Sequence, residues 1–77
     1  MIDIQWAKEV EPYNERRRFK IYYQRNGQDQ NATVMEYTDG IFVVCEAEYY
    51  KGNKPTEKDR QTLCEYATKH LLFADKC

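Results

Sequence analysis

Apolar and polar residues alternate along most of the first fifty positions of the chain, with the period of two that is typical of half-buried β-strands. The alternation predicts strands over about 2–10, 17–25, 28–38 and 41–50. A break at 51–55 precedes apolar residues at helical spacing, with Thr56 as the expected N-cap of a helix. We therefore expect one small α+β domain over 1–77, an antiparallel four-stranded β-β-β-β-α meander with its C-terminal helix packed on one sheet face.

Two tight turns fix the expected register of the last three strands. Asn26-Gly27 and Asp39-Gly40 each stand between alternating segments, where a type I′ turn needs positive φ at both central residues. Counting outward from each turn places Val34 opposite both Phe19 and Cys45. A shift of one residue would exchange the two faces of a strand, so the assignment of side chains depends on this register.

The first face of this expected sheet is predicted to pack against the helix. It carries a small-residue centre framed by larger apolar side chains: Phe19, Ile21, Tyr23, Ala32, Val34, Val43, Cys45, Ala47 and Tyr49. The helix offers one stripe at helical spacing, made of Leu63, Tyr66, Ala67, His70 and Leu71, with Leu72 and Phe73 at its end. We expect this stripe to lie in the groove of the first face.

The second face is expected to carry an apolar cluster beside charged residues. The predicted partner-binding residues are Met35, Tyr37, Phe42 and Val44 at the centre, with Arg18, Lys20 and Tyr22 as the adjoining polar edge. Contiguous aromatic and aliphatic residues rimmed by charge are typical of interaction sites. An ordinary surface, or one covered by the first strand, is the alternative interpretation of this cluster.

The charge balance argues against a general affinity for nucleic acid. Twelve Lys and Arg residues stand against thirteen Asp and Glu, for a net charge of −1. The one basic run is 16–18 with Lys20, and we expect Arg17 to pair with Glu36 across the sheet. A small sheet-plus-helix domain that binds nucleic acid through aromatic and Arg residues stays open as the alternative function.

No constellation of residues points to catalysis, a metal or a cofactor. His70 is the only histidine, and the three cysteines, Cys45, Cys64 and Cys77, are widely spaced without a CxxC pair. We expect free thiols, two of them buried, and no enzyme activity.

The remaining features favour a soluble cytoplasmic protein, because the start of the chain lacks a signal-peptide pattern and the longest apolar run is only Ile41 to Cys45. The sequence therefore predicts a non-enzymatic protein-binding module or inhibitor that acts by stoichiometric contact, with a protein partner or by self-association as a homodimer. Its size and character resemble those of the small proteins with which phages and mobile elements block host defences, such as anti-CRISPR inhibitors.

Overall fold

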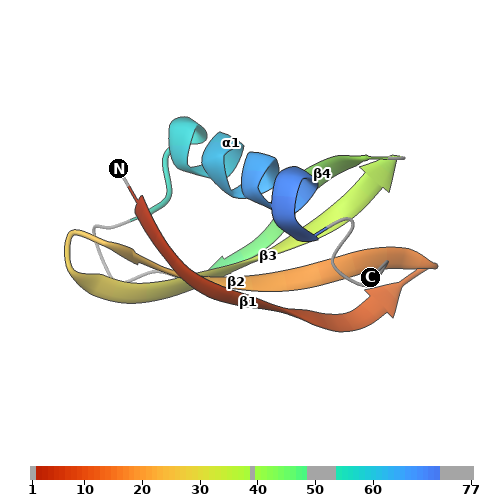
Figure 1. The fold of residues 1–77 in the computed structure, drawn as a ribbon, viewed down its shortest axis with the longest axis horizontal. Helices are drawn as coiled ribbons and strands as arrows, with labels where there is room; N and C mark the ends of the chain where they lie inside the picture. The colour runs from red at the N-terminus through yellow and green to blue at the C-terminus, as the bar shows by residue number, and fades with distance from the viewer. Residues whose placement is uncertain (1, 39, 49–53, 72–77) are drawn as a thin grey trace.

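The fold is a four-stranded antiparallel meander followed by one helix, as the sequence predicts (Figure 1). The computed structural model describes residues 2–38, 40–48 and 54–71. Its elements are β1 (Ile2–Tyr13), β2 (Arg16–Arg25), β3 (Gln28–Thr38), β4 (Ile41–Glu48) and α1 (Glu57–Tyr66), with a π-helical turn (Ala67–Leu71) after α1. The predictions for Asp39, Tyr49, Leu72, Phe73 and Cys77 lie outside the described residues.

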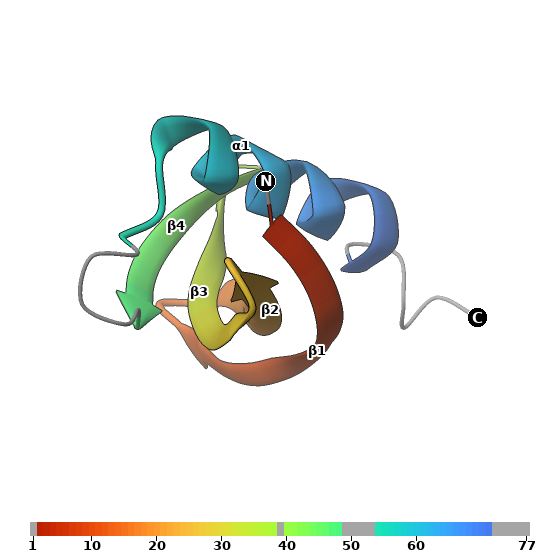
Figure 2. The ribbon, with the colours of Figure 1, turned by 90° about the vertical axis from the view of Figure 1, so that its left-hand side faces the viewer.

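The core lies between α1 and the sheet face that turns toward it. Figure 2 shows the sheet curling beneath the helix, with β4 on one side and β1 on the other. The buried apolar residues come from β2, β3, β4 and the helical segment: Phe19, Ile21, Tyr23, Ala32, Val34, Phe42, Leu63 and Ala67. The other face of the sheet, which we call the outer face, has no element packed on it among the described residues.

The β2–β3 hairpin has the predicted register throughout. Asn26 and Gly27 adopt positive φ angles of 54° and 74°, as a type I′ turn requires. Counting from this turn, Phe19 pairs with Val34 and Arg18 with Met35. The side chain of Arg18 therefore lies on the outer face, and that of Phe19 in the core.

The β3–β4 hairpin departs from the predicted register in its middle. The predicted pairs are present at its two ends: Thr38 with Ile41, Thr33 with Glu46, and Ala32 with Ala47. Between them the pairing is displaced by one residue, so that Val34 faces Val44 rather than Cys45. Tyr37 on β3 and Cys45 on β4 are the extra residues, and each forms a β-bulge.

Between these two bulges, the side chains of β4 point to the opposite faces from those predicted. Phe42 is only 5% exposed and its ring lies 5.9 Å from that of Phe19, while Val44 packs partly buried against the core. The predicted outward position of Phe42 and Val44 is therefore wrong. Conversely, Val43 and Cys45, which we expected in the core, are exposed.

The cause is the unbroken apolar run of β4. Residues 41–45 show no alternation, so the hydrophobic pattern does not fix which of them points inward. The aromatic ring of Phe42 buries more apolar area than Val43 would in the same place, which favours the displaced pairing.

A third bulge changes β1. Ile4 pairs with Tyr23 on the core side, but Gln5 is extra, so Trp6 pairs with Tyr22 on the outer face. Simple alternation over 2–10 would instead put Trp6 on the same face as Ile4. Because bulges increase the local twist, the three of them together suit a sheet that curls around one helix.

The first strand is also longer than predicted. It runs through Pro12 to Tyr13, and a second irregularity lies between Val10 and Tyr13. A proline is tolerated there because β1 is an edge strand and its missing N–H is not needed for pairing. The turn to β2 is made by Asn14 and Glu15, with positive φ angles of 50° and 65°.

A polar clamp joins the start of α1 to the sheet. The Thr56 hydroxyl accepts from the Asp59 backbone N–H at 3.1 Å, and the Asp59 carboxylate accepts from the Thr56 N–H at 3.0 Å, which completes a capping box. The Arg25 Nε also donates to Asp59 Oδ2 at 2.8 Å. Burial alone would raise the pKa of Asp59, but the hydrogen bonds from Thr56 and Arg25 outweigh it and hold the pKa below 3.8.

The helical stripe packs much as predicted. Leu63 and Ala67 are fully buried, and Tyr66 and Leu71 pack against the core. His70, expected within the stripe, is exposed instead, and its ring lies 4.9 Å from that of Tyr66.

The register of β4 predicts that substitutions at two adjacent residues change the free energy of unfolding by very different amounts. Phe42→Ala should lower the free energy of unfolding by about 3–5 kcal/mol, because it leaves a cavity beside Phe19. Val43→Ala should change it by only about 0.5 kcal/mol, as for an exposed position. Urea unfolding of both variants measures the difference, and a larger loss for Val43→Ala would contradict the displaced pairing.

The clamp predicts a specific acid sensitivity. Asp59→Asn should destabilise the fold by about 3 kcal/mol at neutral pH, since it removes the buried negative charge that accepts hydrogen bonds from Arg25 and Thr56. The stabilisation by the ionised Asp59 is complete above the ordinary pKa of 3.8 and is lost as the pH falls through the lower pKa of the folded state. The gap in unfolding free energy between wild type and variant should therefore close on going from about pH 7 to about pH 2. A gap independent of pH would contradict this role.

Candidate functional site

The outer face is organised in three rows that cross all four strands. The row nearest the β3–β4 turn contains Val10, Arg18, Met35 and Val43. The middle row contains Lys8, Lys20, Thr33 and Glu46. The far row contains Trp6, Tyr22, Asn31 and Glu48. Cations thus gather over β1 and β2, and carboxylates over β4.

The structure divides the predicted site residues into three groups. Arg18, Met35 and Tyr37 stay together at the turn end of the outer face. Lys20 and Tyr22 lie in the other two rows, beside β1. Phe42 and Val44 leave this face for the core, as described above.

An apolar patch forms at the turn end, which we define as Met35, Tyr37, Ile41 and Val43. Tyr37 and Ile41 are each 57% exposed, and Val43 is 37% exposed. Ile41 and Val43 share a face because β4 alternates regularly up to its bulge. The displaced register therefore removes Phe42 and Val44 from the predicted cluster and supplies the exposed residues Ile41 and Val43 in their place.

Two arginines at the rim of the apolar patch are held in position. The Arg16 guanidinium lies 5.4 Å from the centre of the Tyr37 ring and donates to the Tyr37 carbonyl oxygen. The Arg18 Nε donates to the Glu11 carbonyl oxygen at 2.8 Å. Arg17 points to the core side, where it pairs with Glu9 at 3.0 Å rather than with Glu36 as predicted.

A second group, which we call the stacked cluster, lies at the far end and comprises Trp6, Tyr22, Lys8 and Lys20. The rings of Trp6 and Tyr22 stack with centroids 4.2 Å apart and planes inclined by 12°. The ammonium groups of Lys8 and Lys20 lie 6.0 Å and 5.7 Å from the Tyr22 centroid. Trp6 nevertheless stays 52% exposed.

The two lysines of the stacked cluster are directly opposite one another on paired strands. Like charges in this arrangement repel and lower the stability of a sheet. The Glu48 carboxylate is 4.0 Å from Lys20 but is largely exposed to solvent, so it screens the pair only weakly.

A pocket of about 330 Å³ adjoins the stacked cluster. It is lined by Gln5, Trp6, Tyr22, Tyr23, Asp29 and Gln30. Gln24 Nε2 donates to Asp29 Oδ1 at 2.9 Å, and Gln5 Nε2 donates to Asp3 at 3.0 Å. The polar rim of the pocket is thus held by side-chain hydrogen bonds.

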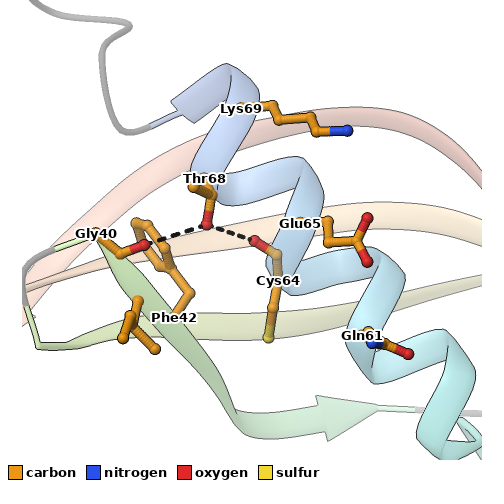
Figure 3. Close-up of a pocket in the computed structure, with 8 residues that line it drawn as sticks. Gly40, Phe42, Gln61, Cys64, Glu65, Thr68 and Lys69 are labelled. Atoms are coloured by element: carbon orange, nitrogen blue, oxygen red, sulfur yellow. Dashed lines mark hydrogen bonds between the residues drawn. The ribbon is translucent and has the colours of Figure 1, made fainter.

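A different hollow, of about 290 Å³, lies between α1 and β4 (Figure 3). Thr68 spans its end, since its hydroxyl donates to the carbonyl oxygens of Gly40 and Cys64 at 3.4 Å and 3.0 Å. Burial raises the pKa of the Cys64 thiol, which keeps it protonated and weakly nucleophilic at neutral pH. Both described cysteines, Cys45 and Cys64, are free thiols, but Cys45 is exposed and Cys64 is only half-buried, so the prediction that two of the thiols are buried is wrong.

Within the described ranges, no three His, Cys, Asp or Glu side chains converge as metal ligands would. No helix in the same part of the chain has the length and apolar character needed to cross a membrane.

Sequence reasoning missed Trp6 and Lys8 as members of the outer face. The signal was present: Ala7 and Lys8 interrupt the alternation of the first strand, which is where the Gln5 bulge shifts the register. A single break in the alternation does not show whether the bulge comes before or after Trp6. The sequence alone therefore does not determine on which face of the sheet Trp6 lies.

Comparison with known proteins gives no relative: no protein-family model, no curated protein and no solved structure matches the chain.

Repulsion between Lys8 and Lys20 lowers the stability of the fold, so removing it should stabilise the protein. Lys8→Glu should raise the free energy of unfolding by about 0.2–1 kcal/mol, because it replaces a repulsive cross-strand pair with an attractive one. Lys8→Gln should give a smaller gain. Urea unfolding at low and high salt tests this, and the gain should shrink as salt screens the charges. A Lys8→Glu protein less stable than wild type at low salt would contradict the repulsion.

Proposed function

We propose that the protein is a non-enzymatic binding protein that forms a stoichiometric complex with a protein partner through the outer face of its sheet. The apolar patch at the turn end is the centre of the contact. The observation that carries this proposal is the exposure of Tyr37, Ile41 and Val43 side by side, on a face that no described element covers. Soluble domains rarely leave contiguous apolar residues of this kind open without an interaction to use them.

The composition of the patch fits an interface core. Tyr, Met and Arg are enriched at the centres of protein interfaces, and Tyr and Arg are favoured as hot spots. Tyr37 is held by Arg16, and Arg18 by the Glu11 carbonyl, before any partner arrives. Side chains that are already ordered lose less conformational entropy on binding, which favours affinity.

Charge around the patch supports a defined orientation of the partner. Arg16 and Arg18 lie on the β2 side, whereas Glu46 lies on β4 at the opposite side. A partner with the complementary distribution would bind in one orientation and be repelled in the reverse one. The small net charge of −1 leaves such local charges as the main electrostatic guide.

An inhibitor is the form of binding protein that we favour. The chain is short, and Tyr37, Ile41 and Val43 gather at one end of one face, which suits blocking a surface of a larger protein. An anti-defence inhibitor of a phage or mobile element, such as an anti-CRISPR protein, is the specific version of this proposal. Self-association through the same patch is the competing version.

The patch predicts which substitutions abolish binding. Tyr37→Ala should weaken the complex by about 1–3 kcal/mol, as for an interface hot spot. Val43→Lys should weaken it further by placing a charge in the apolar centre. Both positions are exposed, so the free energy of unfolding of each variant should stay within about 0.5 kcal/mol of wild type.

The experiment captures the partner from the source cell with the wild-type protein and then measures its affinity for each purified variant by calorimetry. Thr62→Lys, on the exposed side of α1, is the matched control and should bind like wild type. Sedimentation of the protein alone at two concentrations separates a homodimer from a complex with another protein. Wild-type affinity for the folded Tyr37→Ala and Val43→Lys variants would overturn the proposal.

A further inference from the structure

We propose that the stacked cluster is a separate binding site for single-stranded nucleic acid, in which a base stacks on Trp6 and a phosphate lies between Lys8 and Lys20. This site is in the two rows remote from the turn, and only Lys20 and Tyr22 of the residues predicted from sequence belong to it. The proposal does not depend on the apolar patch, and its variants are different ones.

The first argument is the geometry of the rings. The rings of Trp6 and Tyr22 stack with a centroid distance of 4.2 Å and nearly parallel planes, so the contact with Tyr22 fixes the orientation of the indole. Trp6 remains 52% exposed, which leaves aromatic surface for a further ring. Unpaired bases stack on aromatic side chains in this way whatever their sequence.

The second argument is the charge beside the rings. Lys8 and Lys20 occupy the next row of the sheet, and their ammonium groups lie 6.0 Å and 5.7 Å from the centre of the Tyr22 ring. Their repulsion disfavours the free fold, and an anion placed between them would remove it. A phosphate group can fill this place, because it carries negative charge and in a nucleotide it is joined to a base that can stack on Trp6.

The third argument is the direction in which the charges continue. Arg18 stands in the row after the lysines, and Arg16 beyond it, so the basic residues follow the β1–β2 pair from one end to the other. Glu46 and Glu48 lie on β4 across the sheet and would repel a strand that ran over that side. A nucleic-acid strand is thus directed along β1 and β2, over two to four cations.

The fourth argument concerns base selection. The pocket of about 330 Å³ next to Trp6 is lined by Gln5 and by the exposed carboxylate of Asp29. A carboxylate accepts hydrogen bonds from exocyclic amino groups, such as the N4 amino group of cytosine, and thymine has none. The site should therefore prefer cytosine to thymine.

The limited number of cations sets the strength of the interaction. Binding to a single strand shows a slope of about −0.7 per phosphate contact in a plot of log affinity against log salt. With two to four contacts we expect a slope of about −1.4 to −2.8, which is shallow compared with general nucleic-acid binders. This agrees with the net charge of −1, because the affinity is local and does not require an overall basic protein.

The experiment uses the fluorescence of Trp6, the only tryptophan in the chain, titrated with the short oligonucleotides (dC)₈ and (dT)₈ at low salt. Stacking of a base should quench this fluorescence, and (dC)₈ should bind more tightly than (dT)₈. Asp29→Asn should remove that preference. Fluorescence that is unchanged by either oligonucleotide at low salt would overturn the proposal.

Matched variants test each part, with binding followed by the anisotropy of labelled oligonucleotides. Trp6→Ala should weaken binding roughly 5- to 150-fold, whereas Tyr13→Ala, at the remote and equally exposed end, should not. Lys8→Gln with Lys20→Gln should reduce the salt slope by about 1.4, while Lys54→Gln with Lys58→Gln, the same change in charge near α1, should leave it intact. Equal effects of the two lysine pairs would overturn the site, as would unchanged affinity in a folded Trp6→Ala protein.

Discussion

The two extra residues in the β3–β4 pairing, Tyr37 and Cys45, decide which side chains of β4 reach the helix. Because they displace only the middle of the hairpin, the turn and the far end keep their pairing while Phe42 enters the core. The ring of Phe42 then packs against Phe19 beneath α1, and Val43 becomes part of the outer face. The place of Phe42 in the core and the composition of the apolar patch both follow from this local displacement.

The two faces of the sheet compete for apolar residues, because one face builds the core and the other carries the exposed groups. A chain of 77 residues has little apolar material from which to build a core, and the face under α1 takes the apolar side chains that are fully buried. The clamp of Arg25 and Asp59 adds to this packing by fixing the start of the helix to the tip of the β2–β3 hairpin. Among the described residues no element packs on the outer face, which carries exposed rings and a pair of opposed lysines.

Those exposed groups divide the outer face into two ends with different chemistry. Around Tyr37 the surface is apolar with fixed arginines, which suits a protein partner. Around Trp6 it is aromatic and basic, which suits bases and phosphates. The two proposals share Arg16 and Arg18, but the apolar patch and the stacked cluster that carry them have no residue in common, so either can fail without the other.

The sequence was sufficient for much of the fold, and the reason is physical. The Asn26-Gly27 turn fixed the β2–β3 register because only a few residue types tolerate two positive φ angles, and Thr56 with Asp59 marked the start of α1.

The candidate site was less predictable because its residues depend on bulges. The run from Ile41 to Cys45 is apolar at every position, so no alternation showed that Phe42 would turn inward and Val43 outward. In β1, the face of Trp6 depends on one extra residue, Gln5, and nothing in the residue type of Gln5 indicates a bulge at that position.

The displaced pairing is tested most directly by nuclear Overhauser effects between the backbones of β3 and β4. The account predicts cross-strand contacts between Val34 and Val44 and between Met35 and Val43, together with the contact between Thr38 and Ile41 at the turn. Contacts between Val34 and Cys45 and between Met35 and Val44 would instead show an unbroken hairpin. Phe42 would then lie on the outer face, and the account of the core and of the apolar patch would be wrong.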